Sequence, residues 1–530
     1  MIAQRLANRR PDAAAHDRRG RARPGARAPA AVALLAAVAA AVGVAFAILS
    51  ALRPAHGAGG AASSLTAQTV ISGRPVGPPV PAGFVGISIE LRALEQYAGT
   101  DPRSPDPVLL ALIRQIAPGQ RPVLRLGGDS TDWSWWPVPG MARPGGVRYA
   151  LTPLWMQVAR SLAGALDARL ILGVNLEADS PRVAAAEGQA MVSGIGRRSI
   201  AALEIGNEPE LYGSFGWYRN AAGREVPGRP PGYDLSDFIG EFHRFARVLP
   251  DVPLAGPSSG APAWLAQLSR FVGEAPRLRL VTVHAYPLKH CRRSTVVTIA
   301  QLLSAAAFRG LAARLAGYVR VAARAHLPLR VDEFNAVSCG GTRGVSDSFA
   351  SALWILDALF ELERAGVAGV NVHSVPNTIN EVLGPELVDG SWRMRVHPEY
   401  YGMIMFAQAA PPGSRLLAVR ASLPRGIDVW ATRSPSGGVH VLLVDRRLRG
   451  SSTVALRIAW ARAPASLERL QAPSAAATSG VTLGGRTFGA ATATGELAGE
   501  PANLVVQPTA GLYSVRLPAA SAALLTIPPS

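Results

Sequence analysis

The sequence predicts an α/β fold, a (β/α)8 TIM barrel at residues 65–410 followed by an antiparallel β-sandwich at residues 411–530. Two observations lead to this prediction. From residue 84 to residue 374, eight apolar strand-like segments alternate with helix-like segments, as a barrel of eight βα units requires. After residue 411 the pattern changes to short alternating runs separated by Gly, Pro and Ser, which is typical of a sandwich.

The barrel strands are expected where an apolar run rich in β-branched residues gives way to a loop. The eight expected segments are 84–90, 122–128, 170–177, 200–208, 252–259, 280–286, 329–335 and 369–374. Between them, segments such as 234–249 and 348–366 have apolar residues at three- and four-residue spacing, which indicates helices covering a barrel. Residues 65–81 are a candidate extra strand of the C-terminal sandwich.

Residues 1–64 are expected to lie outside the folded domains. A tail rich in arginine precedes Ala28–Leu52, a run without charged residues that is long enough to span a bilayer at about 1.5 Å per residue. Basic residues before this run and only Arg53 just after it predict a cytoplasmic N-terminus and an extracytoplasmic remainder. The alternative is a removable signal peptide, which also places the folded part outside the cytoplasm and leaves it secreted.

Of the formal net charge of +18, the first 64 residues supply nine Arg and two Asp, or +7, which leaves +11 on the folded part and favours anionic partners. An acidic glycan fits an exported protein better than nucleic acid, and the sequence carries no nucleic-acid-binding motif. The chain has a single lysine, Lys289, so arginine supplies almost all of the positive charge. A coding bias toward arginine is the alternative explanation of this composition.

Two carboxylates stand at the ends of predicted strands. The fourth strand ends in Asn207-Glu208-Pro209 and the seventh in Asp332-Glu333. Because active sites of (β/α)8 barrels lie at the C-terminal ends of the strands, Glu208 and Glu333 are expected to face each other there. One carboxyl group can protonate a glycosidic oxygen while the other attacks or activates water, so the pair predicts glycoside hydrolysis without a cofactor. An ion pair with an arginine is the alternative for each glutamate.

Other polar residues are expected near this pair. Glu204 shares the face of Glu208 but lies deeper, so we expect it to pair with a buried base. Glu210 follows the proline, where a position on the rim or an ion pair is expected. His284 is expected to line the mouth of the barrel. Arg125, on the second strand, is expected either to hold Glu333 ionised or to neutralise Glu204.

The two cysteines predict a disulfide and no metal site. Cys291 follows the sixth strand and Cys339 the seventh, so their loops are neighbours in an exported protein. His284, His290 and Cys291 also invite a zinc interpretation, but neither an HExxH motif nor paired CxxC motifs accompany them.

A tryptophan-rich loop follows the second strand. Its side chains Trp133, Trp135 and Trp136 could stack on a sugar or pack against the barrel. Asp132 in the same loop could bind a hydroxyl group or cap the loop.

The segments LEIGNEPELY (203–212) and VDEFNAVSCGG (331–341) resemble glycoside hydrolase family 79, a group of retaining β-glucuronidases and heparanase-like enzymes. The resemblance covers residues 75–530. It implies that Glu208 is the general acid/base, that Glu333 is the nucleophile and that the substrate is a β-glucuronide or a uronate-containing glycan. A relative that cleaves a neutral β-glycoside is the alternative. A non-catalytic glycan-binding protein is disfavoured because both glutamates are present.

The resemblance also implies substrate contacts. It assigns Asn207 to the sugar 2-hydroxyl and Tyr286 to a hydrogen bond with the nucleophile. It assigns Glu90 to the ring hydroxyls, and the backbone amides of Gly340 and Gly341 to the glucuronate carboxylate.

The sequence departs from the family on the eighth strand. The family has a tyrosine there that assists recognition of the carboxylate, whereas this chain aligns His373. This departure bears on uronate specificity more than on hydrolysis.

Overall fold

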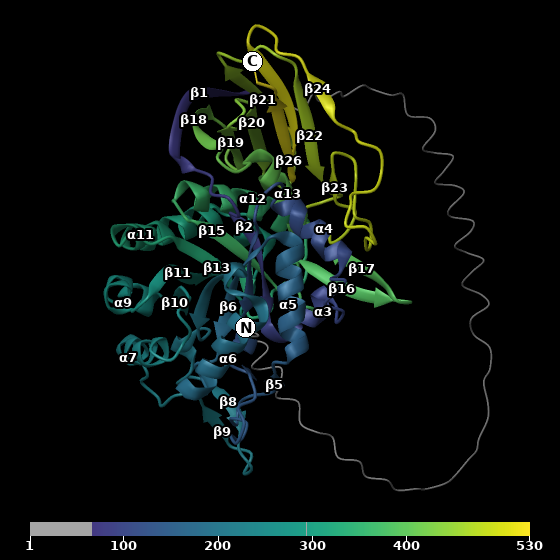
Figure 1. Cartoon of the computed structure of the whole chain (residues 1–530). Helices are drawn as coiled ribbons and strands as arrows, with labels where there is room; N and C mark the ends of the chain where they lie inside the picture. Colours follow the sequence, from purple (N-terminus) through teal and green to yellow (C-terminus); the bar gives the residue numbers. More distant parts are fainter. Residues whose placement is uncertain (1–65, 293, 530) are drawn as a thin grey trace, which may run out of the picture. The chain divides into compact units, whose positions relative to one another are not determined.

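The computed structural model describes residues 66–292 and 294–529 (Figure 1). The predicted tail, linker and apolar run at 28–52 lie outside the described residues. Among the helices of the described part, none combines the length and the apolar character needed to cross a membrane.

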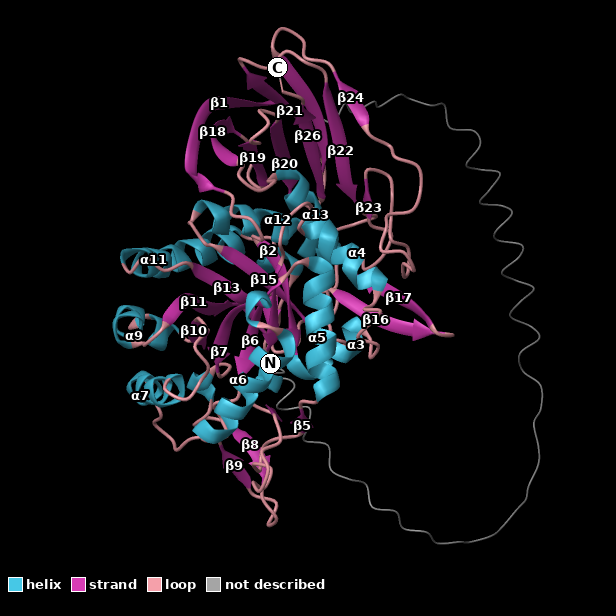
Figure 2. Ribbon diagram, in the orientation of Figure 1, coloured by secondary structure: helices cyan, strands magenta, loops and turns pink. Residues whose placement is uncertain are grey.

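The eight predicted strands form one closed parallel barrel, which confirms the predicted fold (Figure 2). Their order around the barrel is β10-β11-β13-β15-β2-β3-β6-β7. The strands are β2 (Val85–Glu90), β3 (Val123–Gly127), β6 (Arg169–Val174), β7 (Ile200–Ile205), β10 (Leu254–Ser259), β11 (Leu278–Ala285), β13 (Leu329–Phe334) and β15 (Gly369–Ser374). Because all eight run in parallel, their C-terminal ends meet at one mouth, where the predicted carboxylates lie.

Helices follow the strands and cover the barrel with their apolar faces. They are α3 (Leu94–Ala98), α4 (Pro107–Ile116), α5 (Pro153–Leu166), α6 (Pro181–Ile195), α7 (Leu235–Ala246), α8 (Pro262–Leu265), α9 (Leu268–Glu274), α10 (Ile299–Leu302), α11 (Leu311–Arg324), α12 (Phe349–Arg364) and α13 (Pro398–Ala409). Local sequence fixes several starts: Asp106, Thr152 and Ser180 cap helices whose first residue is proline.

Ten strands form a second, mostly antiparallel sheet that includes the C-terminal part of the chain. They are β1 (Thr66–Pro79), β18 (Arg415–Ser422), β19 (Ile427–Arg433), β20 (Val439–Asp445), β21 (Ser451–Ile458), β22 (Ala465–Gln471), β23 (Thr482–Leu483), β24 (Leu504–Val506), β25 (Leu512–Pro518) and β26 (Ser521–Ile527). β1 precedes the barrel in the chain but pairs with β18 and β21, so segments from both sides of the barrel sequence share this sheet.

Helix α12 lies between the barrel and this sheet, and nearly its whole length is buried. On the barrel side Trp354 stacks on Phe334 of β13. On the other side Phe360 stacks on Trp430 of β19, and the indole N–H of Trp430 donates to Asp357 Oδ1 at 2.8 Å. A helix that packs on two faces buries its polar residues as well, and Asp357 and Glu361 of α12 are paired with Arg446 and Arg309.

Candidate active site

The turn after β7 fixes the position of Glu208. Gly206 has φ of 77°, and a Cβ atom there would meet the Tyr212 hydroxyl at 2.6 Å, so only glycine fits. Glu208 itself has φ of 48°, a conformation that costs a non-glycine residue on the order of 1 kcal/mol or more. Its N–H donates to the carbonyl of Ser258 at 2.9 Å, which holds this turn against the end of β10.

Glu333 is fully buried at the end of β13. Oε1 accepts a hydrogen bond from the Tyr286 hydroxyl at 2.7 Å, and Oε2 accepts one from Arg125 Nη1 at 2.8 Å. Burial opposes ionisation of this carboxylate, but the charges of His373, His284 and Arg125 outweigh burial and hold its pKa well below the usual range. Glu333 is therefore an ionised carboxylate with both oxygens held in place.

Arg125 lies below the carboxylates, and both roles expected for it are combined in the structure. Besides Glu333, its Nε lies 2.7 Å from Glu204 Oε2 and 3.0 Å from Asp332 Oδ2. Burial and the charge of Glu204 raise the pKa of Asp332, so Asp332 is the protonated member of this group. Arg125 thus forms ion pairs with Glu204 and Glu333 at the same time.

His284 connects the two predicted catalytic residues. Its Nδ1 lies 3.0 Å from Glu208 Oε1 and 3.8 Å from Glu333 Oε2. Burial lowers the pKa of His284, but the negative charge of Glu333 and the hydrogen bond to Glu208 outweigh burial and raise the pKa to about 10. His284 is therefore protonated at neutral pH and donates its Nδ1–H to Glu208.

Glu208, His284 and Glu333 each offer one atom within 4.8 Å of the others. This spacing is compatible with a metal ion, but the His284 nitrogen on this side carries a proton and Glu333 already accepts two strong hydrogen bonds. A metal ion would have to displace this proton and these hydrogen bonds. The geometry instead suits a pair of carboxyl groups that act on one substrate bond.

Asn207 and Asp132 belong to a second buried network. Asn207 Oδ1 accepts a hydrogen bond from Arg125 Nη2 at 2.8 Å. Asp132 accepts from the N–H of Asn207 at 3.1 Å, from the Tyr212 hydroxyl at 2.6 Å and from the N–H groups of Leu176 and Glu177. Asp132 therefore joins the loops after β3, β6 and β7, which corresponds to the capping alternative.

Glu90 and His373 contact each other below the mouth. The N–H groups of Asp129 and Ser130 donate to the fully buried carboxylate of Glu90 at 3.2 and 2.8 Å. His373 Nε2 lies 3.6 Å from Glu90 Oε1, and its Nδ1 lies 3.0 Å from Ser88 Oγ. In the structure, both Glu90 and His373 therefore contact other groups of the protein.

The loop after β13 carries three consecutive residues with positive φ, Cys339, Gly340 and Gly341, at 61°, 87° and 88°. A Cβ atom on Gly341 would meet Asn380 Oδ1 at 2.4 Å, so close packing as well as backbone conformation requires glycine there. Cys339 is bonded to Cys291, which ties this loop to the one after β11.

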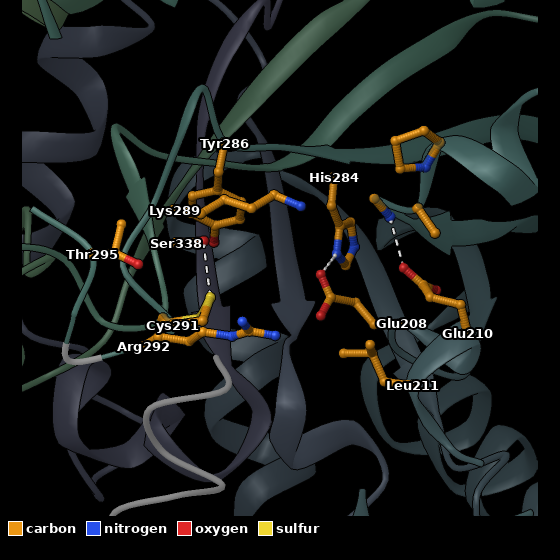
Figure 3. Close-up of a pocket in the computed structure, with 14 residues that line it drawn as sticks. Glu208, Glu210, Leu211, His284, Tyr286, Lys289, Cys291, Arg292, Thr295 and Ser338 are labelled. Carbon is orange, nitrogen blue, oxygen red and sulfur yellow. Dashed lines mark hydrogen bonds and ion pairs between the residues drawn. A yellow bond between two sulfur atoms is a disulfide. The ribbon is translucent and has the colours of Figure 1, made fainter. Parts of the chain in front are cut away.

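A pocket of about 480 Å³ opens beside Glu208 (Figure 3). His284 and Tyr286 line it together with Glu208 and Glu210. Glu210 accepts a hydrogen bond from the N–H of Gly260 at 3.0 Å. Burial and the charge of Glu208 raise the pKa of Glu210 to about 7. Glu210 therefore lies on the wall of the pocket.

The tryptophans of the loop after β3 pack mainly against protein. Trp133 and Trp135 are buried in a small cluster with Val147, Val183 and Trp217. Trp136 is partly buried against the main core. Packing is thus the role that the structure gives to Trp133 and Trp135.

Ser258 is a site residue that the sequence interpretation missed. Its Oγ lies 3.2 Å from Arg125 Nη2 and 3.1 Å from His284 Nε2. It is the penultimate residue of β10, the fifth predicted strand, so a search for polar residues near every strand end could have identified it.

The fold and family comparisons define the class of the protein. Structural similarity extends to a 4-O-α-L-rhamnosyl-β-D-glucuronidase from Fusarium oxysporum 12S (18% identity, 86% of this chain and 100% of that chain covered, TM-score 0.67). It also extends to an α-L-arabinofuranosidase from Thermotoga maritima (14% identity, 87% of this chain and 100% of that chain covered, TM-score 0.62). A third similar structure is the bifunctional glucanase-xylanase CelM2 from a metagenome library (13% identity, 88% of this chain and 99% of that chain covered, TM-score 0.57). No curated protein matches the sequence.

The chain is a glycoside hydrolase. Residues 428–524 match the glycosyl hydrolase family 79 C-terminal beta domain, which confirms the resemblance to family 79. The match falls within the C-terminal sheet, from β19 to β26.

Proposed function

We propose that the protein is a retaining β-glycosidase in which Glu208 is the general acid/base and Glu333 the nucleophile. The observation that carries this proposal is the approach of their carboxyl oxygens to within 4.8 Å. Retaining enzymes hold the two carboxyl groups about 5–5.5 Å apart, whereas inverting enzymes need about 6.5–9.5 Å to admit a water molecule.

The contacts of the two glutamates suit these roles. Glu208 protonates the glycosidic oxygen while Glu333 attacks the anomeric carbon, so that a glycosyl ester forms and the leaving group departs. His284 donates to Oε1 of Glu208, which leaves Oε2 to carry the transferred proton. Water then attacks the anomeric carbon as Glu208 takes its proton, and Glu333 is released as a carboxylate. The Tyr286 and Arg125 hydrogen bonds orient Glu333 for the attack.

We propose β-glucuronides as the substrates. Three observations support this choice: the family 79 match, the glucuronidase activity named for the Fusarium relative and the net charge of +11 (18 − 7) on residues 65–530. Glycine-rich backbone at Gly340 and Gly341 suits a carboxylate, because successive N–H groups can approach an anion closely there. A neutral β-glycoside is the second candidate, because His373 occupies the position of the family tyrosine and contacts Ser88 and Glu90.

Hydrolysis of matched substrates tests this proposal. Aryl β-D-glucuronide, β-D-glucoside and β-D-xyloside with the same aryl group are compared for wild type, Glu208→Ala and Glu333→Ala. The proposal predicts the highest kcat/KM for the glucuronide and its loss in both variants. If the glucoside or xyloside were cleaved faster, the neutral-glycoside candidate would replace it.

We propose that the enzyme works outside the cytoplasm, with residues 28–52 as an uncleaved anchor. The apolar composition of this segment and the arginines before it support this. Mass determination of the mature N-terminus in membrane and soluble fractions tests it. A shortened chain in the soluble fraction would identify a signal peptide instead.

A further inference from the structure

The pocket lies on the side of the proton donor. Glu208 lines it, whereas Glu333 is fully buried and does not. In the proposed mechanism the acid protonates the oxygen that joins the sugar to the leaving group. Tyr286 and His284, which contact Glu333 from the same pocket, mark its part nearest the cleaved sugar. The part of the pocket lined by Lys289 and Arg292 is therefore the space that the leaving group would occupy.

Two cationic side chains line this pocket, Lys289 and Arg292 (Figure 3). They extend from the loop after β11, which lies across the pocket from Glu208 and Glu210, and their charged ends point into the pocket. Both are exposed, and neither side chain forms an ion pair or hydrogen bond with another residue in the described ranges 66–292 and 294–529. Two cations without partners in one pocket are suited to an anion from outside the chain.

The loop that carries these cations is held at several points. Leu288–Lys289 pairs with Val337–Ser338 as a short parallel ladder. Cys291, between the two cations, is bonded to Cys339 of the neighbouring loop. On the same loop, His290 Nδ1 lies 2.9 Å from Thr342 Oγ1. These contacts fix the backbone that presents the cations, so the ordering required when an anion binds falls mainly on the two side chains.

The acids on the opposite wall do not neutralise these cations. His284 donates to Glu208, and Glu210 accepts from the N–H of Gly260. An anionic leaving group would therefore be attracted to one wall of the pocket and kept away from the other, which would orient it.

We propose that Lys289 and Arg292 form a leaving-group subsite that selects substrates whose leaving group carries a carboxylate or sulfate. The inference rests on the proposed glycosidase function and extends it, because it assigns an anion to the leaving group as well as to the cleaved sugar. The natural substrate is then an acidic oligosaccharide or an anionic aryl glycoside.

A pair of aryl β-D-glucuronides tests the subsite in the full chain. One carries a 4-carboxylate on the ring and the other an uncharged 4-carboxamide of similar shape. The quantity compared is the ratio of kcat/KM for the carboxylate glycoside to kcat/KM for the carboxamide glycoside. At low ionic strength we expect this ratio to be about tenfold higher in wild type than in the Lys289→Gln/Arg292→Gln variant. Comparing variants cancels the difference in leaving-group ability. The carboxamide glycoside should react within about twofold in both proteins.

The control variant is Arg324→Gln, which removes an exposed charge at the end of α11, just before β13 begins and thus at the opposite end of the barrel. It should keep the preference of wild type. A 4-sulfonate glycoside distinguishes the two anions, and selection of either supports the subsite.

Two results would overturn the inference. Equal losses on the charged and uncharged glycosides would assign the cations to the cleaved sugar, and an unchanged ratio would leave them without a role in selection. Calorimetric binding of the same glycosides is measured in parallel. If no glycoside were cleaved, the proposed function would fail, while a carboxylate-selective affinity lost in the double variant would still establish the subsite.

Discussion

Arg125 Nη1 lies 2.8 Å from Oε2 of Glu333, and both side chains are completely buried. The charges of His373 and His284, together with this ion pair, hold the proposed nucleophile ionised. Removing either partner of the ion pair would leave the other charge buried and unpaired. The same guanidinium serves Glu204. Catalysis and stability therefore depend on one side chain, and suitable variants can separate these two contributions.

Replacing Arg125 with methionine should destabilise the protein by about 3–5 kcal/mol, because Glu204 and Glu333 then remain buried without their partner. A second substitution, Glu204→Leu, should recover part of the unfolding free energy by removing one of these charges. Activity should stay lost, because Glu333 still lacks the Arg125 hydrogen bond that orients it. Urea unfolding and kcat/KM measure the two effects, and recovery of activity in the double variant would refute the role of Arg125 at Glu333.

Tyr286→Phe should lower kcat/KM about 10- to 100-fold, because a hydrogen bond to a charged group is worth about 1.5–3 kcal/mol. This bond lowers the pKa of Glu333, and reaction requires the ionised carboxylate. Its loss raises that pKa, so the acid limb of the kcat/KM profile should move to higher pH. Tyr318→Phe on α11 serves as the control. A fall in activity without movement of the acid limb would indicate altered packing instead.

The stability of the protein should depend on His284 above neutral pH. The pKa of this imidazole is raised from an ordinary value near 6.5 to about 10. A group whose pKa is raised by folding contributes its full stabilisation at pH values below its pKa in the unfolded chain. This contribution is lost as the pH rises toward the folded pKa of about 10. Unfolding free energies between pH 6 and 10 should therefore fall more steeply for wild type than for His284→Asn. Parallel curves would contradict a protonated His284.

The Cys291–Cys339 disulfide should stabilise the folded state. It joins residues 48 positions apart, and closure of such a loop typically contributes about 2–4 kcal/mol. We expect Cys291→Ser/Cys339→Ser to lower the unfolding free energy by this amount. Denatured, unreduced protein should show no free thiol. Two free thiols per chain would exclude the bond.

Much of the barrel could be predicted from sequence because its strands are buried on both faces. The segment 170–177, for example, begins with the continuous apolar run LILGV before Asn175, and it became β6. The same regularity located Glu208 and Glu333, since a parallel barrel brings all strand ends to one mouth.

The contacts within the site could not be predicted in the same way. Arg125 pairs with both Glu204 of β7 and Glu333 of β13. From the sequence, these two pairings could only be predicted as alternatives. Ser258 lacks a charge or a motif, and its role comes only from its position between Arg125 and His284. The pocket position of Lys289 and Arg292 likewise depends on the path of the loop after β11.

The stereochemistry of hydrolysis tests the central claim most directly. An aryl β-D-glucuronide is mixed with enzyme in an NMR tube, and the anomeric proton of the first product is followed before mutarotation. Double displacement by Glu208 and Glu333 predicts that the β-anomer appears first. Initial release of the α-anomer would mean single displacement by water, and it would contradict the assignment of Glu333 as a nucleophile.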